Sequence, residues 1–84
     1  MIQGVWKTKH LTFSRLPLLA ERKTSQWAVW NHHYGEQLGE IRWYSPWRQY
    51  CFFGDKLVFS QSCLVDIAQM IARLTEALAQ ERLE

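Results

Sequence analysis

His32, His33, Cys51 and Cys63 are among the side chains in this sequence whose types bind metal ions or act as nucleophiles. Imidazole and thiolate are ligands of zinc, but these residues form no Cys-x-x-Cys pair and no His pair separated by three to five residues. Adjacent histidines in a strand also point to opposite faces of a sheet. We therefore expect no metal site and no cofactor.

Catalytic carboxylates and nucleotide-binding motifs are equally hard to find. The aspartates, Asp55 and Asp66, stand in an expected turn and an expected helix, and the glutamates are scattered, so no carboxylate pair for acid–base catalysis is indicated. The sequence contains no Gly-x-Ser-x-Gly and no glycine-rich phosphate loop. A chain of 84 residues also leaves little room for a deep pocket. We expect a protein that is not an enzyme.

The two cysteines are expected to be reduced thiols in a cytoplasmic protein, with a disulfide as the alternative. The sequence begins MIQGVWKTKH, which lacks the apolar stretch of a secretory leader. No run approaches the roughly 18 apolar residues of a membrane span. We therefore expect no membrane partner.

Aromatic residues are abundant, at 14% of the chain with five Trp, so large rings should dominate the core of one small domain, residues 1–84. Runs rich in aromatic and β-branched residues predict strands at 27–34, 38–44 and 48–53, joined by Gly35-Glu36-Gln37 and Ser45-Pro46-Trp47, with a short fourth run at 57–59. The earlier run 5–13, within residues 1–25, is either a further strand or an arm lying across the domain. These elements place the sheet within residues 26–60.

From Ser62 onward the apolar residues recur at helical spacing, which predicts an amphipathic helix over 62–84. Ser60 or Ser62 can cap its N-terminus, and Asp66 is expected in or near the first turn. The fold class is therefore α+β, an antiparallel meander of three to four strands packed on one long C-terminal amphipathic helix.

Alternation along the expected strands sorts side chains onto two faces of the sheet. The face toward the helix is expected to hold Trp27, Val29, Ile41, Trp43, Cys51 and Phe53. The opposite face is expected to show Ala28, Trp30, His32, Glu40, Arg42, Tyr44, Arg48, Tyr50 and Phe52. Arginine and large rings together are typical of protein-binding hot spots. We predict a non-catalytic interaction module whose partner-binding residues are Trp30, Arg42, Tyr44, Trp47, Arg48 and Tyr50.

Other roles for this surface remain open. Single-stranded nucleic acid could stack its bases on the same rings, and residues 1–56 carry eight basic and four acidic side chains. A second copy of the chain, giving a homodimer, is another candidate partner for a self-associating structural module. A further alternative is that residues 1–25 pack over the surface and bury it.

The run LGEIRWYSPWRQYCFF at 38–53, followed by Cys63-Leu64-Val65-Asp66-Ile67, resembles a group of small bacterial and prophage proteins to which no activity is attached. The resemblance covers about residues 26–75. It implies an accessory phage-type protein that binds a host or phage macromolecule, and it identifies no activity.

Overall fold

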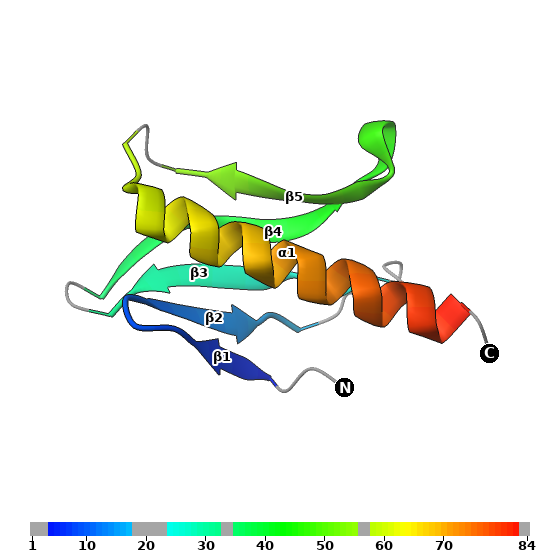
Figure 1. The fold of residues 1–84 in the computed structure, drawn as a ribbon, viewed down its shortest axis with the longest axis horizontal. Coiled ribbons are helices and arrows are strands. Elements are labelled where there is room, and N and C mark those ends of the chain that lie inside the picture. The colour runs from blue at the N-terminus through cyan, green and yellow to red at the C-terminus, as the bar shows by residue number, and fades with distance from the viewer. Residues whose placement is uncertain (1–3, 18–23, 33–34, 56–57, 83–84) are drawn as a thin grey trace.

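The computed structural model describes residues 4–17, 24–32, 35–55 and 58–82. In these residues, five antiparallel strands follow one another across one sheet in chain order, and a long helix crosses one face of that sheet (Figure 1). The expected α+β meander with a C-terminal helix is confirmed, although the sheet has five strands in place of three or four. The elements are β1 Val5–Lys7, β2 Leu11–Arg15, β3 Trp27–Asn31, β4 Glu36–Tyr44, the 3-10 helix η1 Ser45–Trp47, β5 Gln49–Gly54 and α1 Gln61–Arg82.

The N-terminal segment supplies two strands, because a turn divides the run that sequence analysis treats as one. The Thr8 N–H donates to the Leu11 carbonyl at 2.9 Å, and the Leu11 N–H donates to Thr8 Oγ1 at 3.1 Å. The turn contains no Gly, Pro or Asn, so its composition does not reveal it. β2 then pairs with β3 along its whole length. Residues 4–17 therefore widen the sheet and do not lie across either face (Figure 1).

A β-bulge shapes the next strand pair. β4 has one additional residue, Leu38, between the positions that pair with Val29 and Trp30. The neighbouring Gly39 lies where β4 passes close to β5, and a Cβ atom there would clash with the carbonyl oxygen of Phe53. Glycine at this position therefore allows β4 and β5 to pair.

The connection between β4 and β5 sets the register of β5. It contains four residues, η1 followed by Arg48, which has the left-handed φ of 52°. As a result, Tyr44 pairs with Gln49. A three-residue connection, as expected from sequence, would pair Tyr44 with Arg48, and a difference of one residue moves every following side chain to the other face.

The predicted faces of β5 are therefore wrong. Tyr50 and Phe52 face the helix, where they pair across the sheet with Trp43 and Ile41. Cys51 and Phe53 lie on the opposite face. The predicted faces of β3 and β4 agree with the structure. We refer below to the helix face and the open face of the sheet.

Helix α1 begins at Gln61, after a cap formed by Ser60. The Ser60 hydroxyl accepts a hydrogen bond from the Cys63 N–H at 3.2 Å, and its carbonyl accepts from Leu64 N–H at 3.1 Å. Because the helix starts at Gln61, Asp66 lies beyond the first turn. The sequence predicts it in or near that turn. The short strand predicted at 57–59 is absent at the described residues Val58 and Phe59.

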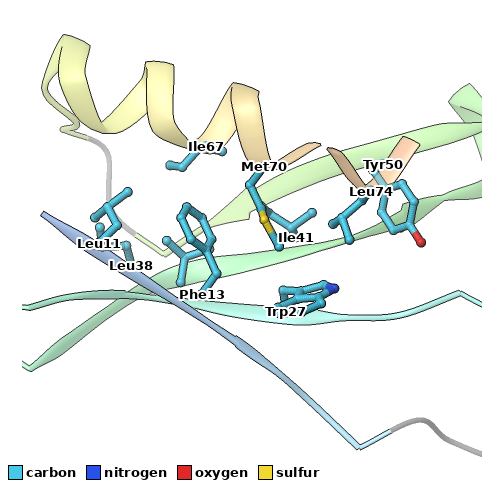
Figure 2. Close-up of a cluster of buried hydrophobic side chains, with 10 residues drawn as sticks. Leu11, Phe13, Trp27, Leu38, Ile41, Tyr50, Ile67, Met70 and Leu74 are labelled. Atoms are coloured by element: carbon cyan, nitrogen blue, oxygen red, sulfur yellow. The ribbon is translucent and has the colours of Figure 1, made fainter. Parts of the chain in front are cut away.

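The core lies between the helix face of the sheet and α1 (Figure 2). Phe59, just before the helix, adds to this layer through an edge-to-face contact with Phe52 at 5.4 Å between ring centroids. Burying each large apolar side chain of this kind contributes about 1.5–3 kcal/mol to the stability of the fold. The buried cluster consists of Leu11, Phe13, Trp27, Val29, Leu38, Ile41, Tyr50, Ile67, Met70 and Leu74.

Candidate functional site

An unbroken series of ring and cation–π contacts runs along the open face over β4 and β5, from η1 to Phe53 near the end of β5. Trp47 of η1 packs edge-to-face on Tyr44, with ring centroids 5.1 Å apart. Tyr44 in turn contacts the ring of Phe53 at 5.7 Å. The guanidinium carbon of Arg42 lies 3.7 Å from the centroid of the Phe53 ring. We call these four residues, Arg42, Tyr44, Trp47 and Phe53, the aromatic surface.

The local backbone explains why these side chains meet. Arg42 and Tyr44 are two residues apart in β4 and therefore point to the same face. Phe53 reaches them from the neighbouring strand, because the four-residue connection gives β5 its register. Trp47 stands in η1 at the end of the pair and is 66% exposed, so its ring forms the outer end of the series.

The charge around this surface is nearly balanced. The Nε atom of Arg42 lies 3.8 Å from a carboxylate oxygen of Glu40, and both side chains are about one-third exposed. An ion pair at this distance and exposure contributes little to stability, about 0–1 kcal/mol. The cation–π contact with Phe53 adds about 0.5–1 kcal/mol. Together, the two contacts hold the guanidinium over the ring.

The structure brings together some of the residues predicted to bind a partner and separates others. Arg42, Tyr44 and Trp47 form the aromatic surface with Phe53, which sequence analysis misses because of the β5 register. Arg48 is exposed and directly follows Trp47.

Two of the predicted residues lie elsewhere. Trp30 shares the open face but belongs to β3, and in the described structure no ring contact joins it to the aromatic surface. Tyr50 is only 5% exposed and packs in the core against Trp43, with the ring centroids 5.6 Å apart. Its predicted place on the open face is therefore wrong, because the strand begins one residue later than sequence analysis assumes.

The cysteines and histidines form no cluster in the described residues. Cys51 lies on the open face and Cys63 on α1, across the sheet from it, and neither forms a disulfide. Residues 4–17, 24–32, 35–55 and 58–82 contain no group of three or more His, Cys, Asp or Glu placed to hold a metal ion. His33 lies outside the described residues. In the same part of the chain, no helix is long and apolar enough to cross a membrane.

Comparison with known proteins identifies no relative of this chain. The sequence matches no family model and no curated protein, and the structure matches no solved structure. The resemblance to small bacterial and prophage proteins therefore stays a prediction.

Proposed function

We propose that this chain is a non-catalytic interaction module that binds a protein partner through the aromatic surface. The observation that supports this function is the continuous contact series from Trp47 to Arg42 on a face that no described element covers. Trp, Tyr and Arg are the residues most enriched in protein-binding hot spots. Large apolar patches on the surface of a folded chain commonly mark binding sites.

The contacts within the aromatic surface also lower the entropic cost of binding. Each ring already rests against another, and Arg42 is held over Phe53, so few rotamers are left to freeze when a partner arrives. Freezing a flexible side chain costs about 0.5–1.5 kcal/mol in an interface. The left-handed backbone conformation of Arg48 also supports the proposal, because non-glycine residues in this conformation are concentrated at functional sites.

The balance of charge favours a protein over a single-stranded nucleic acid. The charged side chains that the described strands place on the open face are Lys7, Glu40 and Arg42, and the exposed Arg48 follows Trp47 in the β4–β5 connection. Nucleic-acid binding draws on several cations that neutralise phosphates. Here Arg42 is already engaged by Glu40 and Phe53, and Lys7 lies at the far edge in β1. A partner with apolar and acidic groups fits this surface better.

The test begins with capture of proteins from a bacterial lysate on immobilised wild-type chain, followed by calorimetry with the purified candidate. We expect Trp47→Ala and Arg42→Ala each to weaken binding at least tenfold, which corresponds to about 1.4 kcal/mol. Val65→Ala is the matched control, since Val65 is exposed on α1 on the other side of the sheet. It should bind like the wild type.

Two results would count against the proposal. Undiminished binding by both Trp47→Ala and Arg42→Ala would place the interface elsewhere. Salt-sensitive binding of a short oligo(dT), followed by the fluorescence anisotropy of a label on the oligonucleotide and abolished in Trp47→Ala, would instead assign the surface to single-stranded nucleic acid.

A further inference from the structure

The two edges of the sheet differ in how well they are protected against pairing with another chain. β1 forms one edge, has three residues and ends at Lys7. β5 forms the other edge over six residues, Gln49–Gly54, with no charged residue, no proline and no bulge (Figure 1). Short strands, lysines, prolines and bulges are the usual means of blocking an edge. The β5 edge has none of them.

The backbone groups on this edge can be assigned from the register. The Asp55 N–H donates to the Leu38 carbonyl at 2.8 Å. Hydrogen-bonded positions alternate along an antiparallel pair, so every second residue of β5 bonds to β4. The N–H and C=O groups of Tyr50, Phe52 and Gly54 therefore point away from the sheet, and no described strand lies on that side.

The flank of α1 above this edge is apolar as well. The Arg73 guanidinium lies 3.9 Å from the ring centroid of Trp6 in β1, so this flank of the helix faces the β1 edge. Successive helical residues are about 100° apart, which places Leu64 and Ala68 on the opposite flank, toward β5. Leu64 is 49% exposed and Ala68 is exposed.

We infer that the chain forms a symmetric dimer in which β5 pairs antiparallel with β5 of a second copy. One register uses every backbone N–H and C=O group that points away from the sheet. In it, Phe52 pairs with Phe52 of the second copy, and Tyr50 pairs with Gly54 of the second copy. Each of these pairs exchanges both N–H···O bonds. A second copy is the partner because a two-fold axis makes this edge complementary to itself without any other sequence.

The dimer has a defined arrangement of its other surfaces. Paired residues in a sheet project to the same side, so both α1 helices lie on one side and their Leu64 flanks face each other. The two aromatic surfaces lie together on the other side and present two binding sites to a partner. The β1 edges stay at the outer ends, where the short strand and Lys7 stop further growth of the sheet.

Analytical ultracentrifugation over a range of concentrations tests the dimer against a chain mass of 10.0 kDa. We expect twice this mass at high concentration. Cys51→Lys introduces a charge at the middle of the β5 edge, and Leu64→Lys introduces one on the helix flank. Each should weaken dimerisation at least tenfold. Val5→Lys, at a 51% exposed position in the other edge strand, is the control and should dimerise normally.

Amide hydrogen exchange followed by NMR tests the register in the wild type. We expect the amides of Tyr50, Phe52 and Gly54 to become protected as concentration rises, while those of Cys51 and Phe53 are protected throughout. A monomer at every soluble concentration would overturn the inference. So would a dimer that both lysine variants leave intact, or one in which the Tyr50 and Phe52 amides stay exchangeable. Trp47→Ala should dimerise normally, which separates this inference from the proposed function.

Discussion

The two faces of the sheet carry similar aromatic side chains and differ in what covers them. On the helix face, Trp27 and Tyr50 lie in a cluster closed by α1 (Figure 2). On the open face, Tyr44 and Phe53 rest on each other and are partly exposed. Aromatic content alone therefore does not tell which face is the core. The register and the covering helix decide whether a ring stabilises the fold or is available for binding.

The largest difference between the faces is expected for a pair of tyrosines on β4 and β5. Tyr50→Ala should lower the free energy of unfolding by about 3 kcal/mol, because it leaves a cavity in the core beside Trp43. Tyr44→Ala removes a half-buried ring and should cost about 1 kcal/mol. Urea denaturation followed by circular dichroism measures both values.

The same two variants make opposite predictions for binding. Tyr44→Ala should remain folded and lose partner affinity, whereas folded Tyr50→Ala should bind normally at low temperature. Equal losses of stability in the two variants would contradict the assignment of the faces.

A second prediction concerns Gly39, where β4 passes close to β5. Gly39→Ala should destabilise the fold by about 1–3 kcal/mol, because the added Cβ meets the Phe53 carbonyl oxygen and lies 2.9 Å from the Cα atom of Gly54. Gly4→Ala is the matched control, since a Cβ at Gly4 has no neighbour within 4 Å. Thermal unfolding of the two variants side by side measures the difference. A Gly39→Ala protein as stable as Gly4→Ala would show that the strands can separate at no cost.

Local patterns in the sequence predict the helix and the central strands well. The 3.6-residue period after Ser62 predicts α1 because the helix buries one side, and the aromatic and β-branched content of 27–34 and 38–44 predicts the two central strands. The predicted α+β class and the faces of Trp27 and Ile41 follow from these patterns alone.

The features that sequence analysis misses depend on the conformation of single residues. A turn at Thr8–Leu11 has no typical turn residue, so the N-terminal hairpin is predicted as one strand or as an arm. The length of the β4–β5 connection depends on whether Arg48 takes a left-handed conformation, which an arginine rarely does. That single residue moves Tyr50 into the core and brings Phe53 onto the aromatic surface.

The smallest expected effect therefore concerns Arg48 itself. A left-handed conformation costs a residue with a Cβ atom about 1–2 kcal/mol, and glycine avoids this cost. Glycine in turn loses more entropy on folding, about 0.5–1 kcal/mol relative to alanine. Arg48→Gly should therefore leave stability unchanged or raise it by about 1 kcal/mol. Arg48→Ala keeps the strained conformation and should be the less stable of the two in urea denaturation.

This pair of variants separates the two roles of Arg48. Both remove the guanidinium of the exposed residue that follows Trp47, so both should weaken partner binding to the same extent if that charge contributes to the interface. If Arg48→Ala is as stable as Arg48→Gly, the connection does not store strain and a different constraint must set the register of β5. If instead the glycine variant is more stable and binds less tightly, the left-handed arginine contributes to partner binding and lowers the stability of the fold. Such an exchange of stability for function is expected at a functional site.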